Sequence, residues 1–331
     1  MPKSVAIVGA GVSGLTCGVL FAERRYRTAI FAEQSGQETT SGAAAALWFP
    51  YDCEPRTKVV AWALTTYRVL VGLASDPRSG VSMLQLRQYS RTGALAIPEW
   101  AHSLGAHCLS LIPSARRAVA QRRREVEESL TFASIFKSGF AMKVPLMDTT
   151  IYLDYLTNRF RARGGEIHAG VRFDGLDAID PDFDIVINCA GIGARELLHD
   201  VDLEPHRGQV AVVPKINNLS CAVVCDEEPL MYAIPRTNDC LFGGTNELSD
   251  NLAIDRDTTS RIVNECVRTL KIDKPRVLAE RVGLRPYRNS GVRLERDKLR
   301  DGRTIIHNYG HGGSGFTLSW GCAEEVFKIA D

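Results

Sequence analysis

The sequence predicts an α/β fold in which a domain with a parallel sheet is interrupted by an α+β domain with a mostly antiparallel sheet. Three observations lead to this prediction. The chain opens on a buried strand, a glycine turn and a helix. Similar buried strands return in the middle of the chain, and several short strands separated by turn residues occupy much of the rest.

The first observation is a strand, helix and strand at the N-terminus. Residues 4–8 are mostly apolar, as in a buried strand, and lead into a glycine turn. Residues 15–23 follow a helical pattern, and residues 28–32 form the next apolar strand, which ends at Glu33. This order is typical of two parallel strands joined by a crossover helix.

The second observation concerns the middle of the chain. Residues 150–163 are helix-like, and strand patterns follow at 166–171 and 184–189. The second of these strands ends in a turn of small residues at 190–194. We expect both strands to extend the first sheet.

The third observation predicts a second domain. Residues 54–75 and 99–110 are expected to be helical. A basic run and the acidic residues that follow it, between 116 and 128, are expected to form a solvated helix face, because the acids offset the bases. Short strands are expected at residues 209–214, 220–225, 230–235 and 240–245. The predicted boundaries assign residues 1–52, 148–205 and 285–331 to the parallel-sheet domain and residues 53–147 and 206–284 to the interrupting domain.

The composition excludes several classes of protein. The chain has 331 residues and a net charge of only +1. It therefore has no overall positive charge that would attract nucleic acids or membranes. No apolar run reaches the roughly 18 residues that span a bilayer, and neither a signal peptide nor a peroxisomal C-terminus is recognisable. Nine cysteines without a disulfide or metal pattern indicate reduced thiols in the cytoplasm. Monomer and homodimer both stay open.

The N-terminal glycine turn has the pattern Gly9-x-Gly11-x-x-Gly14. The first glycine permits the tight turn, the second lets the backbone approach a pyrophosphate, and the third packs the helix on the strand. Glu33, at the end of the second strand, is placed to accept hydrogen bonds from ribose hydroxyls. The pattern predicts a Rossmann-like dinucleotide site and leaves NAD and FAD both open, as well as a tight turn without a ligand.

A second glycine-rich segment lies near the C-terminus, where four glycines fall between residues 310 and 315, before a helix-like tail. Glycine lets the backbone turn and approach a flat ligand, and the N-terminus of a helix attracts negative charge. Two such turns, some 300 positions apart, can hold opposite ends of one long cofactor. Residues 39–48 add three hydroxyls and a run of alanines, which suit phosphate and ribitol contacts; an ordinary helix N-cap is the alternative.

Taken together, these motifs resemble the D-amino-acid oxidase family. The resemblance begins with the glycine turn and the hydroxyl segment with Leu47 and Trp48. It continues with Gly-Gly-Thr at 243–245, Gly-Leu-Arg-Pro at 283–286 and the C-terminal segment at 307–315. The motifs follow one another in the same order as in the family. It implies an extended FAD and hydride transfer from the amino-acid Cα to flavin N5. The products are then a 2-oxo acid, ammonia and hydrogen peroxide, with O2 as acceptor.

The resemblance also implies roles for three residues. Arg285 matches the arginine that grips the substrate α-carboxylate, which a guanidinium fork can bind bidentately. Tyr232 matches the tyrosine whose hydroxyl bonds the same carboxylate, and the Gly313 carbonyl matches the acceptor of the substrate amine. A salt bridge and a core aromatic are the structural alternatives for the first two. The resemblance places His307 and His311 in cofactor packing and not in acid–base catalysis.

The implied cofactor contacts come from the two glycine segments, the hydroxyl segment and two short turns. They are Gly9, Ala10, Gly11, Val12, Ser13, Gly14, Glu33, Gln34, Thr39, Thr40, Ser41, Ala45, Ala46, Leu47, Val171, Cys189, Ala190, Gly191, Arg285, Gly310, Gly312, Gly313, Ser314, Gly315, Phe316 and Thr317.

The substrate pocket is expected to contain Phe49, Tyr51, Glu228 and Asn246, and it departs from the family at several points. The segment before the tyrosine is shorter than an animal lid, with Glu228 near the place of a second tyrosine. Asn246 stands where D-aspartate oxidases have arginine, which disfavours acidic substrates and predicts neutral ones. Glu227 or Glu228 would favour cationic side chains if either faced the pocket; solvent exposure is the alternative.

Three other functions stay open at this point. A glycine or secondary-amine oxidase would share the fold. An NAD-dependent dehydrogenase would need only the first glycine turn, and a flavin-binding protein without catalysis would need only the cofactor contacts.

Overall fold

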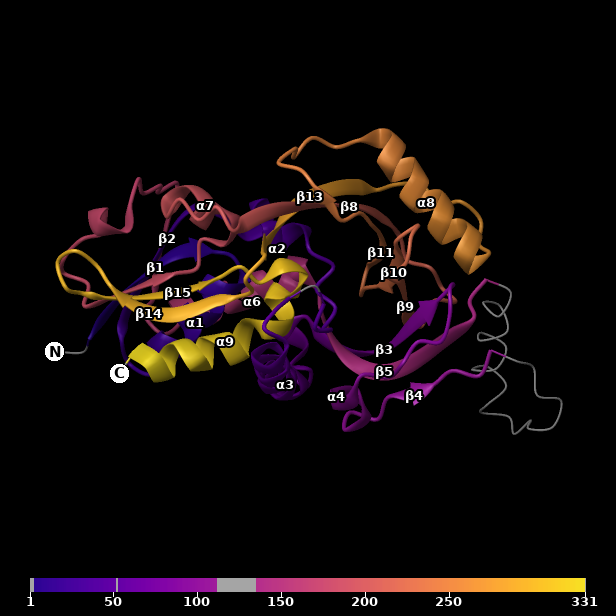
Figure 1. Cartoon of the computed structure of the whole chain (residues 1–331), viewed down its shortest axis with the longest axis horizontal. Helices are drawn as coiled ribbons and strands as arrows, with labels where there is room; N and C mark the ends of the chain where they lie inside the picture. The colour runs from indigo at the N-terminus through magenta and orange to yellow at the C-terminus, as the bar shows by residue number, and fades with distance from the viewer. Residues whose placement is uncertain (1–2, 52, 112–134, 331) are drawn as a thin grey trace.

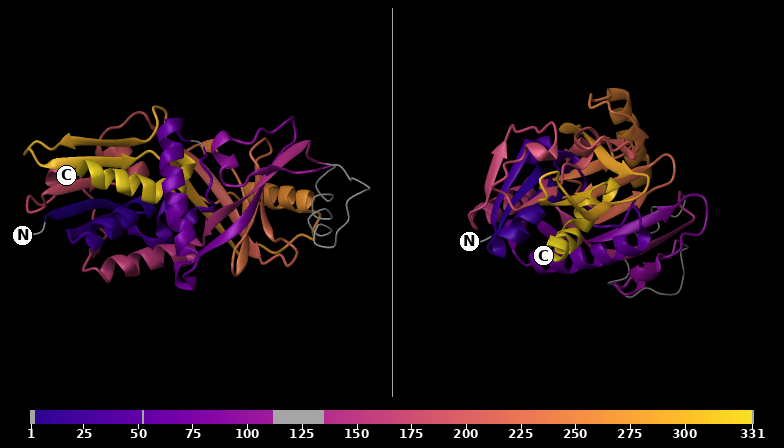
Figure 2. Two further views of the ribbon diagram at one scale, coloured as in Figure 1. Left: turned by 90° about the horizontal axis from the view of Figure 1, so that it is seen from below. Right: turned by 60° about the vertical axis from the view of Figure 1, so that its left-hand side comes forward.

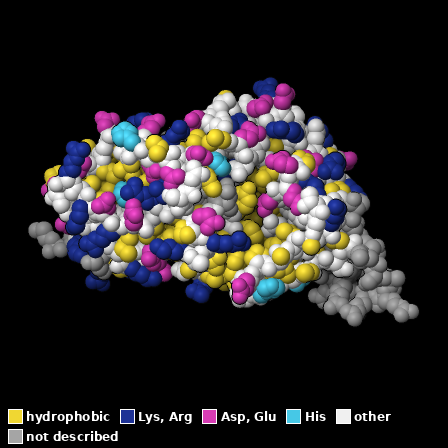
Figure 3. Space-filling model, in the orientation of Figure 1, with side chains coloured by type: hydrophobic (Ala, Val, Ile, Leu, Met, Phe, Trp, Pro, Cys, Tyr) yellow, Lys and Arg dark blue, Asp and Glu magenta, His cyan; other side chains and the backbone are white. Residues whose placement is uncertain are grey.

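The computed structural model describes residues 3–51, 53–111 and 135–330. It has two lobes, each built around one β-sheet, with both chain ends in the same lobe (Figure 1). No described helix is long and apolar enough to cross a membrane. Acidic and basic side chains are interspersed on the face in Figure 3, in keeping with a net charge close to zero.

Sheet A has six strands in the order β14-β15-β7-β1-β2-β6, and only β14 runs antiparallel to its neighbour. Its strands are β1 Ser4–Ala10, β2 Arg27–Ser35, β6 Glu166–Ala169, β7 Ile185–Asn188, β14 Arg293–Lys298 and β15 Thr304–Tyr309. One face packs against three helices: α1 Val12–Glu23, α6 Thr149–Arg161 and α9 Gly315–Ala330. The other face carries a smaller apolar cluster around Leu176 and Phe183.

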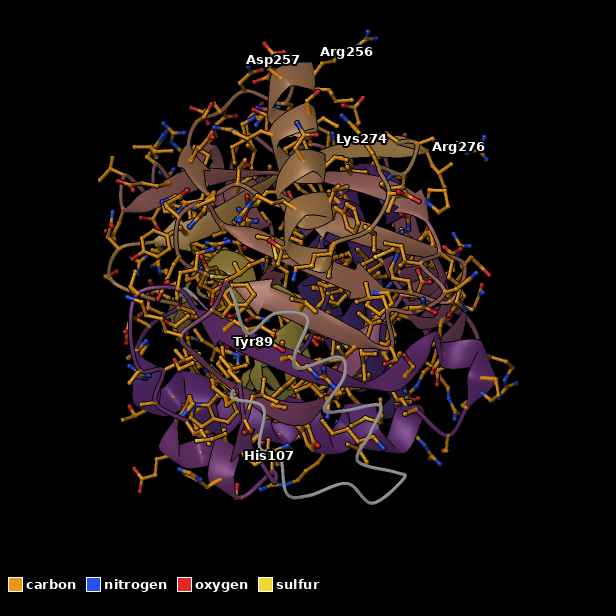
Figure 4. All side chains as sticks on the ribbon, turned by 90° about the vertical axis from the view of Figure 1, so that its right-hand side faces the viewer. Tyr89, His107, Arg256, Asp257, Lys274 and Arg276 are labelled. Carbon is orange, nitrogen blue, oxygen red and sulfur yellow. The ribbon has the colours of Figure 1, made fainter. Side chains whose placement is uncertain are left out.

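Sheet B has nine strands in the order β12-β8-β11-β10-β9-β3-β5-β4, with β13 also paired to β8. All these pairs are antiparallel except β3 with β9. The strands are β3 Val81–Ser90, β4 His107–Cys108, β5 Ser138–Met147, β8 Leu203–Pro214, β9 Cys221–Cys225, β10 Met231–Pro235, β11 Asp239–Gly243, β12 Glu247–Leu248 and β13 Ala279–Arg288. Helix α8 Arg256–Leu270 lies across the outer face of sheet B, and Arg256 and Asp257 mark its N-terminal end at the top of Figure 4.

Helix α3 Arg56–Leu73 crosses between the lobes and contacts α9 (Figure 2). The two helices approach so closely that a Cβ on Gly321 would lie 2.2 Å from the carbonyl oxygen of Trp62. The remaining short elements are η1 Gly36–Glu38, α2 Thr40–Ala43, η2 Pro77–Ser79, α4 Glu99–His102, η3 Leu176–Ala178, η4 Gly191–Gly193, α7 Ala194–Leu197 and η5 Gly312–Ser314.

The structure confirms the predicted fold class, with one parallel and one antiparallel sheet. The helix expected over residues 99–110 is wrong: it stops at His102, Gly105 adopts a left-handed φ of +78°, and residues 107–108 form β4. Strands β3 and β5 and helix α8 were not anticipated. The charged run between 116 and 128 lies outside the described residues.

The expected domain division can be compared with the two sheets. The strands of sheet A lie in three separate parts of the chain, and those of sheet B fill the stretches between them. The expected boundary at residue 285 falls inside β13, which pairs with β8 along its whole length. We propose the two sheets as the centres of two domains, with this boundary at the end of β13.

Candidate active site

A cavity of about 610 Å³ lies between the carboxyl ends of the sheet A strands and the inner face of sheet B. The glycine turn and the ends of β1 and β2 line one end of it, and residues of β3, β8, β9, β10 and β13 line the other. The C-terminal glycine segment lines the cavity as well. The two glycine turns therefore share one cavity, as the sequence suggested.

Close backbone packing explains two glycines of the N-terminal turn. Gly9 has a φ of +105°, and a Cβ there would lie 2.4 Å from the carbonyl oxygen of Cys189. A Cβ on Gly14 would lie 1.9 Å from the carbonyl oxygen of Gly9, so this glycine lets α1 pack on β1. Gly14 does not line the cavity. Its role is to place the helix N-terminus.

The N-terminus of α1 opens into the cavity through Gly11, Val12 and Ser13. The N–H of Val12 donates to Ser41 Oγ over 3.0 Å, and α1 has no acidic residue in its first turn. First-turn N–H groups lack partners within a helix and carry its positive dipole end. This end of the cavity therefore suits a phosphate group.

Carboxylates and a guanidinium surround the end of β2. Arg172 contacts Glu33 at 3.5 Å and Glu196 at 2.6 Å, and all three residues line the cavity together with Gln34. The Glu33 side chain is well exposed and can accept hydrogen bonds from ribose hydroxyls at this position.

The hydroxyl segment lines the cavity but also holds the surrounding backbone. Thr39 accepts from the N–H of Gly42 and so caps α2, as the N-cap alternative predicted. Thr40 donates to the carbonyl of Leu284 over 3.3 Å. Beyond it, Ala45, Ala46 and Leu47 present small or apolar surface to the cavity. Five more residues that were expected to contact the cofactor also line the cavity, namely Ala10, Val171, Cys189, Ala190 and Gly191.

Most of the C-terminal segment lines the cavity, namely Gly312, Gly313, Gly315, Phe316 and Thr317. Gly310 and Ser314 do not. Gly310 has a φ of +82° and packs against Arg288, whereas the Ser314 hydroxyl donates to the carbonyl of Tyr51 and accepts from its N–H. The Thr317 hydroxyl makes the same pair of bonds with the backbone of Phe49, each 3.1 Å long.

These two hydroxyls therefore fix the wall formed by Phe49 and Tyr51. The donors that the segment presents to a ligand are instead the backbone N–H groups at the start of α9, which have no partner within the helix. Both wall residues line the cavity, as predicted.

The two histidines of the segment are buried and poor acid–base groups. Burial lowers the pKa of His307 and of His311 to about 4, so both rings are neutral near pH 7. His311 Nε2 lies 3.0 Å from Asn308 Oδ1, and only His311 lines the cavity.

At the other end of the cavity, Arg285 projects from β13. Its Nη1 donates to the carbonyl of Thr245 over 2.9 Å and to Asn246 Oδ1 over 3.3 Å. A Cβ on Gly208, in β8, would lie 2.5 Å from Arg285 Nη2. The guanidinium thus occupies the space that a side chain at 208 would fill. The backbone carbonyl of Thr245 and the side-chain oxygen of Asn246 hold it there.

Tyr232 lies beside this guanidinium, with its ring over a pair of glycines. Cβ atoms on Gly243 and Gly244 would come within 2.1 and 2.8 Å of the ring. Burial raises the pKa of Tyr232, and the nearby Arg285 lowers it only in part, so the hydroxyl stays protonated and can donate. Gly313 completes the group, because a Cβ there would lie 2.9 Å from Tyr51 and 3.7 Å from Arg285.

Of the predicted pocket residues, Glu228 is not in the cavity; its exposed carboxylate accepts from the N–H of Leu230. Sequence reasoning missed many lining residues, among them Leu86, Gln88, Val224 and Asp226. The alternation of side chains along β3 and β9 would have grouped the first three, had β3 and its pairing with β9 been known.

The cavity fits an extended flavin dinucleotide. Glu33 and the α1 N-terminus suit its ribose and pyrophosphate, and glycines leave the backbone bare where a flat ring would lie against the start of α9. Among the described residues no cluster of histidine, cysteine and acidic side chains could hold a metal ion.

Comparisons with known proteins agree with this geometry. The family model described as FAD dependent oxidoreductase matches residues 4–329. A D-amino-acid oxidase of Rubrobacter xylanophilus is 37% identical over 98% of this chain and 94% of its own length. A D-amino-acid oxidase of Streptomyces coelicolor is 38% identical over 98% and 96%. The solved glycine oxidase of Geobacillus kaustophilus superposes with a TM-score of 0.81 at 17% identity, over 99% of this chain and 95% of that one. The chain therefore belongs to the family of FAD-dependent oxidoreductases that contains the D-amino-acid oxidases.

Proposed function

We propose that this protein is an oxidase that deaminates D-amino acids to 2-oxo acids and ammonia, with reduction of O2 to hydrogen peroxide. The observation that carries the proposal is the meeting of Arg285, Tyr232 and Gly313 at one end of a cavity whose other end fits FAD. The D-amino-acid oxidase names of relatives at 37 and 38% identity support the substrate class and its chirality.

Arg285 and Tyr232 bind the substrate carboxylate in this proposal. The guanidinium offers a fork that matches a carboxylate, and Thr245 and Asn246 hold one of its nitrogens in place. The neutral Tyr232 hydroxyl donates to the same carboxylate. Because both side chains are held before substrate arrives, little ordering is left to do on binding.

The Gly313 carbonyl accepts a hydrogen bond from the substrate amine and so turns Cα toward the cofactor. FAD, when bound, supplies the hydride acceptor. The chain contributes orientation, and the N–H groups at the start of α9 favour negative charge at the ring edge beside them. No side-chain base is needed once the amine is neutral, which agrees with the low pKa values of His307 and His311.

Substrates with an acidic side chain are disfavoured. Asn246 is neutral and its amide oxygen already accepts from Arg285, so it offers no cation to a second carboxylate. Neutral side chains are the prediction from sequence, and a glycine or secondary-amine oxidase is the alternative within this fold. The TM-score of 0.81 to a glycine oxidase supports that alternative only at the level of fold.

We also propose that the protein works in the cytoplasm. None of the nine cysteines, all of which lie in the described residues, forms a disulfide, which supports a reducing compartment. A homodimer is a further proposal, and light scattering would test it.

An anaerobic flavin-reduction screen against both enantiomers of each amino acid tests the proposed function. We expect a yellow protein whose flavin is bleached by D-amino acids, and peroxide on admission of air. Bleaching by glycine and sarcosine alone would favour the alternative, and a flavin that no amino acid reduces would contradict an oxidase of either kind.

A further inference from the structure

The inner face of sheet B carries an acidic side chain that the proposed reaction does not use. Tyr232 of β10 pairs with Val224 of β9, so the two side chains share a face of the sheet. Asp226 follows Val224 by two residues and lines the same cavity. Asp226 lies one residue beyond the end of β9, and its charge is among the causes that raise the pKa of Tyr232. Asp226 therefore lies near the proposed substrate-binding group.

The Asp226 carboxylate has a neutral partner. Gln88, a buried residue of β3, donates from Nε2 to Asp226 Oδ2 over 2.7 Å. Among the residues that the structure describes, no arginine, lysine or histidine forms an ion pair with Asp226. The Asp226 side chain is exposed and lines the cavity, and partial desolvation beside the cavity walls raises the pKa of its carboxyl to about 6.

The loop that carries Asp226 is held against the end of β3. The Glu227 carboxylate accepts from Ser90 Oγ and the N–H of Arg91, both at 2.6 Å, and from the N–H of Thr92 at 3.0 Å. Arg91 in turn donates to the carbonyls of Glu227 and Pro229. The Glu227 carboxylate is thus occupied by the hydroxyl and N–H groups of residues 90–92, and the residue before it is held at the cavity.

We propose that Asp226 selects D-amino acids whose side chains end in a cation, such as lysine, ornithine and arginine, in place of the neutral side chains that the sequence predicted. The inference rests on the proposed function: Arg285 takes the α-carboxylate, and Asp226 takes the distal ammonium or guanidinium. The two charges of the cavity then match the two ends of the substrate. A cationic side chain supplies a countercharge that no described residue gives Asp226, whereas an apolar side chain would displace water from the exposed carboxylate without replacing its interactions.

The test compares D-lysine with D-norleucine, which has the same chain length without the ε-ammonium. Both are assayed at pH 8, where the Asp226 carboxyl is ionised and the lysine side chain is charged. For the wild type we expect a higher kcat/KM for D-lysine. For Asp226→Asn we expect at least a tenfold loss with D-lysine and less than a twofold change with D-norleucine. Glu228→Gln removes one negative charge from the same loop outside the cavity, and we expect it to keep the D-lysine preference.

The possible results separate the inference from the proposed function. Oxidation of D-norleucine with no preference for D-lysine, or equal losses on both substrates in Asp226→Asn, contradicts the inference alone. Loss of the preference in Glu228→Gln but not in Asp226→Asn assigns the role to the other acid and overturns it too. Failure of D-alanine, D-norleucine and D-lysine alike to reduce the flavin contradicts the proposed function and the inference with it.

Discussion

The two ends of the cavity use glycine in different ways. At the cofactor end, Cβ atoms on Gly9 and Gly14 would strike backbone carbonyls, so these glycines shape the chain itself. At the substrate end, Cβ atoms on Gly208 and Gly243 would strike the side chains of Arg285 and Tyr232. There glycine leaves room for a functional side chain from a neighbouring strand.

This difference has a consequence for how each end depends on the fold. The turn from Gly9 to Gly14 is one contiguous segment, which packs against Cys189 just after β7 and bonds Ser41. The group around Arg285 needs the pairing of β13 with β8 and of β10 with both β9 and β11. Substitutions at the two ends should therefore separate cofactor binding from substrate binding.

Gly9→Ala should have the largest effect. A φ of +105° is strained for alanine, and its Cβ would lie 2.4 Å from a carbonyl oxygen that cannot move freely. We expect a protein that purifies without flavin and has no oxidase activity, measured by absorbance and peroxide release. Gly36→Ala is the matched control, since Gly36 has a φ of +57° but nothing within 4 Å of the added Cβ. A yellow, active Gly9→Ala protein would contradict the view that this glycine shapes the backbone at the cofactor end.

Arg285→Ala should have the next largest effect. Removing one partner of a buried charged pair costs about 3 kcal/mol or more, which corresponds to at least ~100-fold in kcat/KM. The flavin should remain bound, because the residues proposed to contact its phosphate and ribose line the other end of the cavity. Arg285→Lys keeps the positive charge without the guanidinium fork, so its kcat/KM should lie between those of the wild type and Arg285→Ala. An unchanged KM in Arg285→Ala would rule out the assigned role.

Gly208→Ala should have a smaller effect at the same end. Its Cβ would lie 2.5 Å from Arg285 Nη2, and a flexible guanidinium can move aside at some loss of alignment. We expect KM to rise about tenfold, or roughly 1.4 kcal/mol, with the yellow colour retained. Steady-state kinetics and the flavin spectrum together check this. Loss of flavin in place of loss of affinity would show that the two ends are not separable.

Glu227→Gln should have the smallest effect, on the stability of the loop beside the substrate end. Hydrogen bonds from Ser90 and Thr92, with backbone bonds, lower the pKa of Glu227 to about 2. Its stabilising contribution is therefore present above the ordinary glutamate pKa near 4.5 and is lost as the pH falls from there toward 2.

Losing the charged hydrogen bonds in Glu227→Gln should cost about 1–2 kcal/mol, or a few degrees in Tm. Thermal unfolding of both proteins at pH 7 and pH 3 measures it. The Tm difference should shrink at the lower pH, and a difference that grows would contradict this account of the loop.

Most of the residues proposed from sequence for the cofactor end line the cavity, because they come from short contiguous segments. Hydroxyls were harder to assign: Ser314 does not line the cavity and bonds the backbone of Tyr51, and Thr39 caps α2. Which groups a serine or threonine bonds depends on the segments that pack beside it, and spacing along the chain does not contain that information.

By itself the sequence determined the fold class, and it singled out the N-terminal glycine turn, Arg285 and Tyr232 as candidate site residues. Only the tertiary structure decided that Asp226 faces the cavity, while Glu227 bonds the end of β3 and Glu228 faces solvent. Three acids in a row look equivalent along the chain. All three lie in the loop between β9 and β10, and the hydrogen bonds of Glu227 and Arg91 hold this loop against the end of β3. These contacts between segments far apart in the chain decide which acid lines the cavity.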